Sequence, residues 1–371
     1  MQRYFFSSTF SIIFTEMIRE DYHVIGVMSG TSLDGIDLAE LSFQVSSEGS
    51  WSYKILKAET IAYSPIWKKN LQKAISFSEE RIIAFNIEYT KYLAKVISGF
   101  ITKHQIKSLD AVCNPGHTIW HQPEKGFTLQ IGNLPELASL INEKVVCDFR
   151  VQDVALGGHG APLVPIGDRL LFSEYDYCLN LGGFANISFE NEDRKRIAYD
   201  VSPVNIVMNI YAELLGRPYD DKGKFASSGD LNSKLLQQLN ALEYYARSAP
   251  KSLGLEWVQN KIFPLLEASG SSLEDILRTF VEHIAIQLAN QFKERSSVLI
   301  TGGGVFNEFL ISRLTSHANI EIVIPASKLI EYKEAMIFGL LGVLKLRNEN
   351  NCLASVTGAK RDHSSGEIFI P

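Results

Sequence analysis

The sequence has few cysteines, no cluster of basic residues and no long apolar run. Its four cysteines are Cys113, Cys147, Cys178 and Cys352, and three of them lie in apolar, strand-like segments. Their wide spacing predicts buried free thiols of a reducing compartment, and it argues against a disulfide framework or a metal site. Basic residues number 36 and acidic residues 42, which gives a net charge of −6. Nucleic acid and anionic membrane surfaces are therefore not expected as partners.

No apolar run reaches the roughly 18 residues that a membrane helix needs. The longest candidate, Phe5–Phe14, has only Arg3 before it and no small-x-small cleavage site after it. A secretory signal is the alternative interpretation. We interpret residues 1–16 as a disordered or non-native extension, because the first expected strand follows soon after Met17. The expected location is the cytoplasm.

The chain alternates between apolar strand-like segments and amphipathic helical segments, and 371 residues are enough for two domains. Strands are expected at 24–27, 36–41, 53–61, 109–113, 127–131, 144–149, 177–189 (a hairpin), 197–201, 297–301 and 320–324. Helices are expected from Pro65, from Ser78, and at 135–141, 204–216, 231–239, 255–267, 273–292, 307–316 and 335–346. The segment at 156–165, rich in glycine and proline, is expected to cross between domains. This alternation indicates an α/β fold with a partly parallel sheet.

The first pair of strands is joined by a turn of unusual composition. The turn and the start of the second strand supply Gly30, Thr31, Ser32, Leu33, Asp34, Gly35, Ile36 and Asp37. Glycines let backbone N–H groups approach an anion, and hydroxyl groups add further donors. The carboxylates of Asp34 and Asp37 can hold Mg²⁺ directly or through water. An ordinary hairpin with polar turn residues is the alternative.

Two more glycine turns follow strands later in the chain. Gly182 and Gly183 join two strands, and Gly302, Gly303 and Gly304 lie between a buried strand and a helix that begins at Asn307. Each turn alone is weak evidence of function, since such turns are common in loops. The recurrence of strand, glycine turn and strand in both halves predicts two related lobes built on similar sheets.

Taken together, the three turns resemble those of the sugar kinase, actin and heat-shock chaperone superfamily. Further motifs narrow the resemblance to anhydro-N-acetylmuramic acid kinases. These motifs are Met28–Asp37, Asp148–Arg150, Gly157–Leu163, Gly183–Ile187, Pro218–Asp220 and Ser355–Ala359. The resemblance covers nearly the whole chain from about Tyr22. It implies a two-lobed ribonuclease H-like or actin-like ATPase fold, with the nucleotide in a cleft between the lobes.

The resemblance also implies a reaction. That family uses ATP and Mg²⁺ to hydrate and phosphorylate 1,6-anhydro-N-acetylmuramic acid, giving N-acetylmuramic acid 6-phosphate in peptidoglycan recycling. Water attacks the anomeric carbon, and the departing O6 accepts the γ-phosphoryl group, so a general base is needed. The family's base maps to Asp200, which opens the stretch Asp200–Asn205. Both glycines and the threonine of the family's motif are replaced in this stretch.

Other site residues follow from the same resemblance. Glu334 matches a glutamate that helps to place sugar and water, and Thr118, His121 and Asn205 are the expected substrate contacts. The resemblance implies that the first two glycine turns bind the phosphates of the nucleotide from opposite lobes. The third turn, together with Asn307, is expected to bind the adenosine.

Plainer roles are open for several of these side chains. Asp200 could cap the following helix. Glu334 is expected in the first turn of the last long helix, where its carboxylate could simply interact favourably with the helix dipole. His117 and His121 could be packed polar residues, and Asp153 is interpreted as stabilising the loop between the lobes.

We expect residues 17–147 and 347–371 to form the first lobe, and residues 148–346 the second. Two rival functions stay open. One is a kinase of the same fold that phosphorylates an ordinary sugar hydroxyl, in which Asp200 would deprotonate that hydroxyl. The other is a nucleotide-dependent binding or assembly protein, or an inactive relative. The sequence also leaves open whether the chain forms a homodimer.

Overall fold

The computed structural model describes residues 20–30 and 33–371. The predicted extension at 1–16 lies outside the described residues, as do Thr31 and Ser32 of the first glycine turn. Within the described ranges, no helix is both long and apolar enough to cross a membrane.

Strands and helices alternate along most of the chain. The strands are β1 (Asp21–Met28), β2 (Gly35–Val45), β3 (Trp51–Ala62), β4 (Ala111–Asn114), β5 (His117–Gln122), β6 (Phe127–Ile131), β7 (Val145–Cys147), β8 (Tyr177–Leu181), β9 (Phe184–Glu190), β10 (Arg196–Pro203), β11 (Ser297–Thr301), β12 (Glu321–Val323) and β13 (Glu367–Phe369). The α-helices are α1 (Pro65–Lys73), α2 (Glu79–His104), α3 (Glu136–Ile141), α4 (Val151–Ala155), α5 (Pro165–Leu171), α6 (Asn205–Leu214), α7 (Lys224–Ser228), α8 (Ser233–Asn240), α9 (Glu243–Ala246), α10 (Leu255–Trp257), α11 (Phe263–Ala268), α12 (Leu273–Ala289), α13 (Glu308–His317), α14 (Ser327–Leu346) and α15 (Ala354–Thr357).

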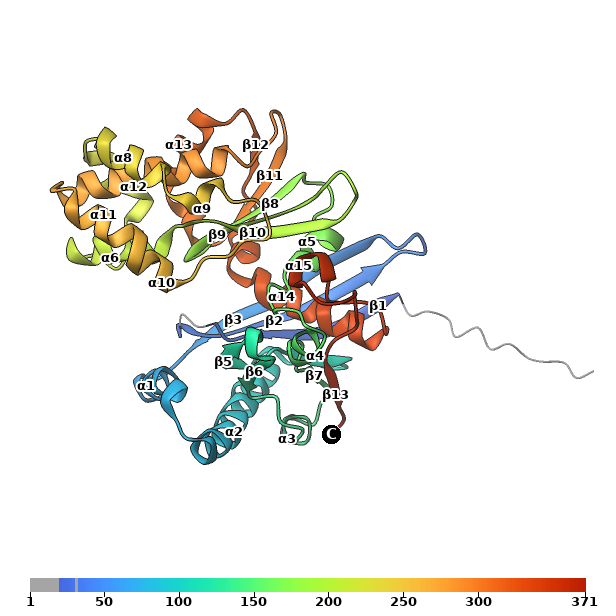
Figure 1. Ribbon diagram of the computed structural model, residues 1–371. Helices are drawn as coiled ribbons and strands as arrows, with labels where there is room; N and C mark the ends of the chain where they lie inside the picture. The colour runs from blue at the N-terminus through green and yellow to red at the C-terminus, as the bar shows by residue number, and fades with distance from the viewer. Residues whose placement is uncertain (1–19, 31–32) are drawn as a thin grey trace, which may run out of the picture.

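The two main sheets share one strand order. The first runs β13-β7-β4-β1-β2-β3, and the second runs β10-β9-β8-β11-β12. In each sheet the first three strands in chain order pair antiparallel, and the next two strands add in parallel. This shared order confirms the prediction of two related lobes, which Figure 1 shows as two sheets with helices around each.

Alternation along the strands builds three cores. On β1, Ile25 and Val27 face helices α1–α3, whereas Val24 faces α14. On β8, Leu179 packs against the helices of the second lobe, whereas Cys178 joins the core that surrounds α14. Because successive strand side chains point to opposite faces, both faces of each sheet are buried. The core around α14 thus draws side chains from both sheets.

Helix α14 packs closely on the first sheet, against β1, β2 and β4. Glycines permit this approach: a Cβ added at Gly26 would lie 1.9 Å from the carbonyl oxygen of Ala335, and one at Gly342 would lie 2.1 Å from Cys113 Sγ. In Figure 1 the helix lies between the two sheets. Our division of the chain at 147/148 and 346/347 remains a proposal, and it would assign α14 to the second lobe although α14 packs on the first sheet.

The structure corrects some predicted elements. Residues 117–122, which none of the expected strands covered, form β5, which pairs with β6 in a separate two-stranded sheet. The segment at 156–165, expected to cross between domains, follows helix α4, and its last residue, Pro165, begins helix α5. Helix α14 begins at Ser327, eight residues before the predicted start. Its N-cap Ala326 makes no side-chain capping hydrogen bond, so the start carried no recognisable signal.

Candidate active site

The first candidate region is the turn between β1 and β2. Leu33 has a positive φ of 58°, and its N–H donates to the Gly30 carbonyl over 3.3 Å. At the start of β2, Asp37 accepts a hydrogen bond from Thr60 Oγ1 over 2.6 Å. Burial raises the pKa of Asp37, the Thr60 hydroxyl opposes the rise, and the negative charges of Asp34 and Glu331 add to it. Negative charge therefore accumulates beside this turn.

A buried polar cluster anchors the residue before the turn. Ser29 Oγ lies 2.6 Å from Tyr63 Oη and 2.8 Å from His117 Nδ1, and Tyr89 Oη donates to Ser29 over 3.1 Å. Burial lowers the pKa of His117 to about 4, so this imidazole is neutral at pH 7. The interpretation of His117 as a packed polar residue is confirmed, since it is buried and hydrogen-bonded inside the first lobe.

Glu334 projects from α14 toward the same region. Part of Glu334 is exposed to solvent. Its carboxyl group is nevertheless surrounded by protein atoms, and this burial raises its pKa. Arg150 opposes this rise, Asp37 adds to it and Lys333 opposes it. Glu334 is the eighth residue of α14, so our expectation that it lies in the first helical turn, next to the positive end of the dipole, is wrong.

Arg150 is a functional candidate that sequence reasoning did not select. Its guanidinium donates to the Gly160 carbonyl over 2.7 Å, and lies 5.7 Å from the Phe338 ring centroid. Burial lowers the pKa of Arg150, and the carboxylate of Glu334 is the first of the charges that oppose the change. The sequence signal was its place in the motif Asp148–Arg150, which follows the buried strand β7.

His121 lies near this arginine, at the exposed end of β5. Its Nδ1 is 3.0 Å from Thr128 Oγ1. Burial lowers the pKa of His121, and the positive charges of Arg150 and His159 lower it further. Thr118 lies on the same strand, where its hydroxyl accepts a hydrogen bond from Gln130 over 3.4 Å. Charge interactions thus link His121 to Arg150 and Arg150 to Glu334, and Thr118 lies on the strand of His121.

The second and third glycine turns meet at one edge of the second sheet. A Cβ at Gly302, where φ is 83°, would lie 2.7 Å from Asn180 Oδ1, so the β8 and β11 ends are in contact. Asn205, the first residue of α6, donates from its side chain to the Leu181 carbonyl over 3.2 Å. Gly303 has no atom within 4 Å of its Cβ position, which leaves room for a ligand to approach the backbone.

Asn307 already has a structural task beside these turns. It is the N-cap of α13, and its Oδ1 accepts from the Leu310 N–H over 2.9 Å. Its side chain is buried. Any contact with an adenosine would therefore come from the neighbouring backbone or from a rotated side chain.

Asp200 lies in β10, beside a β-bulge between Asp200 and Ser202. Its Oδ2 accepts from the Leu253 N–H over 2.9 Å, and its carbonyl accepts from the Tyr244 hydroxyl over 2.7 Å. Burial raises the pKa of Asp200, and the Leu253 hydrogen bond opposes the rise. The capping alternative is wrong, because Val204 is the N-cap of α6 and no side chain caps that helix.

Comparison with known proteins identifies the family. The family model for anhydro-N-acetylmuramic acid kinase matches residues 22–371. This chain belongs to that family. The anhydro-N-acetylmuramic acid kinase of Mannheimia succiniciproducens is 35% identical, covering 95% of this chain and 100% of that protein. The one from Aliivibrio fischeri is 34% identical, covering 93% and 98%. The structure of xylulose kinase from Lactobacillus acidophilus, 11% identical over 94% of each chain, aligns with a TM-score of 0.42, too low to support an argument.

In this member of the anhydro-N-acetylmuramic acid kinase family, a buried ionic cluster joins the helix of Glu334 to the strand of Asp200. Lys333 Nζ lies 2.7 Å from Asp168 Oδ1 on α5. Asp168 Oδ2 accepts from Ser188 on β9, and Ser188 accepts from Arg196 on β10 over 2.9 Å. Two neighbouring residues of α14 therefore have different partners. Lys333 pairs with Asp168 of the buried ionic cluster, and Glu334 interacts with Arg150.

Proposed function

We propose that this chain is an ATP-dependent kinase that opens 1,6-anhydro-N-acetylmuramic acid with water and phosphorylates O6. The product is N-acetylmuramic acid 6-phosphate, an intermediate of peptidoglycan recycling. The main support is the family match over residues 22–371. The surroundings of Asp200 in the structure are consistent with the base that this reaction requires.

In this proposal Asp200 takes the proton from the attacking water. The Leu253 N–H donates to Oδ2, and no hydrogen bond or ion pair from residues 20–30 and 33–371 engages Oδ1, which therefore suits a water molecule. Partial burial raises the pKa of Asp200, so its carboxylate is a stronger base than an exposed aspartate. The water attacks the anomeric carbon, and the bond from that carbon to O6 breaks. O6 then bonds to the γ-phosphorus of ATP, whose bond to the β–γ bridging oxygen breaks and releases ADP.

Glu334 is proposed to orient the sugar and the water, with Arg150 holding the carboxylate ionised through its positive charge. Thr118 and His121 are proposed to contact the sugar from β5, and Asn205 from the start of α6. His121 has a lowered pKa, so at neutral pH its ring is uncharged and can donate or accept a single hydrogen bond.

ATP is proposed to bind between the glycine turns. The first turn, from Gly30 to Asp37, and the second, Gly182 and Gly183, would supply N–H groups to the phosphates. The third turn, Gly302–Gly304, together with the backbone around Asn307, would receive the adenosine. The open space at Gly303 and the contact between the β8 and β11 ends support this arrangement.

Asp34 and Asp37 are proposed to hold Mg²⁺, directly or through water. Carboxylate oxygens are the ligands that Mg²⁺ prefers. Burial is the main cause of the raised pKa of Asp37, and the negative charges of Asp34 and Glu331 add to it; a bound cation would offset these charges. When bound, Mg²⁺ neutralises phosphate charge during transfer. A cytoplasmic location, where ATP is available, and a homodimer belong to the same proposal.

The experiment is a reaction of the purified chain with ATP, MgCl₂ and 1,6-anhydro-N-acetylmuramic acid, followed by mass spectrometry of the sugar. We expect a product heavier than the substrate by one phosphoryl group and one water. N-acetylmuramic acid, which has a free O6 hydroxyl, is the matched substrate control. Phosphorylation of that control alone would support a kinase for an ordinary hydroxyl, and phosphorylation of neither sugar would contradict the proposal.

A further inference from the structure

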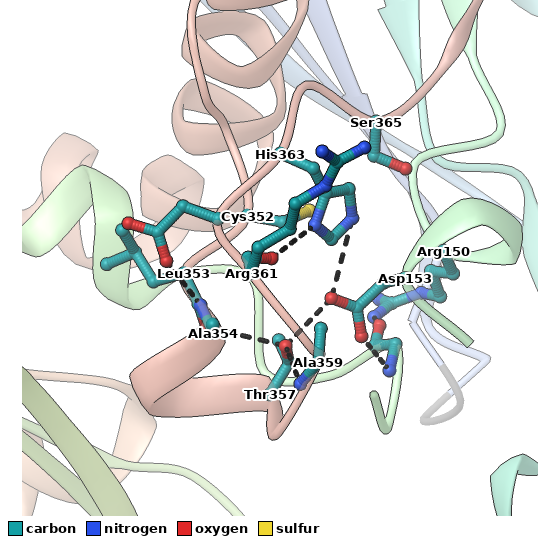
Figure 2. Close-up of polar contacts among 12 residues, drawn as sticks. Arg150, Asp153, Cys352, Leu353, Ala354, Thr357, Ala359, Arg361, His363 and Ser365 are labelled. Atoms are coloured by element: carbon teal, nitrogen blue, oxygen red, sulfur yellow. Dashed lines mark hydrogen bonds and ion pairs between the residues drawn. The ribbon is translucent and has the colours of Figure 1, made fainter. Parts of the chain in front are cut away.

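Three potential metal ligands from distant parts of the chain meet beside α15. They are Asp153 on α4, and Cys352 and His363, which face each other across an antiparallel bridge. One ligand atom from each lies within 4.8 Å of the other two, and all three residues are buried. No other such group of three histidine, cysteine or acidic side chains occurs among residues 20–30 and 33–371. Figure 2 shows their side chains converging.

The tautomer of His363 is fixed by a backbone carbonyl. His363 Nδ1 lies 3.1 Å from the carbonyl oxygen of Arg361. A carbonyl oxygen can only accept a hydrogen bond, so Nδ1 carries the proton. In a neutral imidazole, Nε2 then presents its lone pair. Metal-binding histidines are commonly held in this way, with the second ring nitrogen donating to a carbonyl or carboxylate.

The lone pair of His363 Nε2 has no hydrogen-bond partner. This buried atom is unsatisfied, and it lies 3.6 Å from Asp153 Oδ1, a distance too long for a hydrogen bond. Two acceptors facing each other in a buried site repel unless a cation or a proton lies between them. Oxygen and nitrogen ligands of a tetrahedral zinc ion are about 3.3 Å apart, given Zn–ligand distances near 2.0 Å. The observed separation is close to that value.

Cys352 supplies a thiol to the same site. Its Sγ donates to the Phe149 carbonyl over 3.9 Å, which is a long and weak hydrogen bond. Burial raises the pKa of this thiol to about 12, Asp153 raises it and Arg150 lowers it. A bound metal ion would displace the proton of this thiol.

We propose that Asp153, Cys352 and His363 bind one Zn²⁺ ion, with water as the fourth ligand. Mixed oxygen, sulfur and nitrogen ligands suit zinc better than Mg²⁺ or Ca²⁺, which prefer oxygen alone. The ion would join α4 to the segment 351–365. Asp153 already stabilises this region, because it accepts hydrogen bonds from the Gly160 N–H and the Thr357 hydroxyl, each over 2.7 Å. That stabilising role was predicted from the sequence, whereas cysteine spacing alone argued against a metal site.

The test uses the tag-free full chain, purified without chelator, then stripped and titrated with Co²⁺, whose spectrum reports thiolate ligands and tetrahedral geometry. We expect about one zinc per purified chain, a sulfur-to-cobalt charge-transfer band after titration, and a higher melting temperature with Zn²⁺ than without it. Cys352→Ser should lose the charge-transfer band, and His363→Gln should weaken Co²⁺ binding at least tenfold.

Cys147→Ser is the matched control, because Cys147 is also buried and donates to a carbonyl, that of Asn133. It should keep the zinc and the band. Wild-type protein that retains no zinc and gives no charge-transfer band would overturn the proposal. A band that persists in Cys352→Ser and disappears in Cys147→Ser would place the site elsewhere and overturn it too.

Discussion

At the scale of single residues, Asp200 and Glu334 occupy different electrostatic surroundings. Asp200 has a backbone N–H as its one resolved stabilising partner, whereas Glu334 faces the cations Arg150 and Lys333. The positive charges oppose the rise that burial causes in the pKa of Glu334 and can hold its carboxylate in place. We therefore assign proton transfer to Asp200, which faces no such cation among the described residues, and orientation of a ligand to Glu334.

Asp200→Asn tests this assignment. Asparagine has nearly the same shape, and its side-chain oxygen can still accept from Leu253, but it cannot take a proton from water. We expect turnover to fall by about 10²–10⁴-fold, while calorimetry still shows binding of MgATP and the anhydrosugar. Asp176→Asn is the control, since Asp176 also accepts from a backbone N–H, that of Ser297. Turnover in Asp200→Asn equal to wild type would remove Asp200 from the base role.

The raised pKa of Asp200 also predicts how stability depends on pH. A carboxyl whose pKa is higher in the folded than in the unfolded state favours folding at low pH, and this contribution is lost as pH rises through the folded-state value. At pH 7 the ionised Asp200 therefore opposes folding, and Asp200→Asn should melt at the wild-type temperature or above it. The difference should shrink as pH falls toward 4. A variant that melts well below wild type at pH 7 would show that Asp200 is structural.

At the scale of elements, the β1–β2 hairpin is the predicted phosphate and metal turn. Asp34→Ala and Asp37→Ala should each raise the MgATP concentration needed for half-maximal rate or lower turnover by tenfold or more, with little change in melting temperature. Glu48→Ala is the control, because Glu48 is an exposed carboxylate in the next turn of the same sheet. Wild-type kinetics in both aspartate variants would support the alternative of an ordinary hairpin.

The contact between β1 and α14 requires glycine. A methyl group at Gly26 would overlap the Ala335 carbonyl oxygen, which is backbone and cannot move aside easily. We expect Gly26→Ala to lower the free energy of unfolding by about 1–3 kcal/mol or more. In Gly99→Ala the new methyl group meets no atom within 4 Å, and loss of a helical glycine should stabilise α2 by roughly 0.5–1 kcal/mol. Denaturant unfolding measures both, and equal stabilities would refute the close packing of α14.

Elements with strong apolar periodicity could be predicted from the sequence, and others could not. The stripe of α12 and the buried strands β8 and β11 were recognisable because burial imposes their spacing. Strand β5 was missed because its sequence, from His117 to Gln122, is largely polar and pairs only with β6. The first turns of α14 were missed because Lys333 and Glu334 face charged groups in other elements, which no local pattern reveals.

At the scale of the whole molecule, the candidate site is assembled from distant segments. The glycine turns could be recognised one by one, but the partners of Glu334 depend on how α14 packs across the first sheet. Arg150 and the ionic cluster of Lys333, Asp168 and Arg196 were missed for this reason, since tertiary packing alone brings them together. That cluster joins the strand of Asp200 to the helix of Glu334, so the two carboxylates are held through one buried connection.

The central claim is that water opens the anhydrosugar while O6 receives phosphate, and oxygen labelling tests it most directly. The purified chain is incubated with ATP, Mg²⁺ and 1,6-anhydro-N-acetylmuramic acid in ¹⁸O-enriched water, and the phosphosugar is analysed by tandem mass spectrometry immediately after the reaction. We predict one solvent oxygen at the anomeric carbon and none in the phosphate group. A phosphosugar without solvent oxygen at the anomeric carbon, or label in the phosphate group instead, would contradict this account.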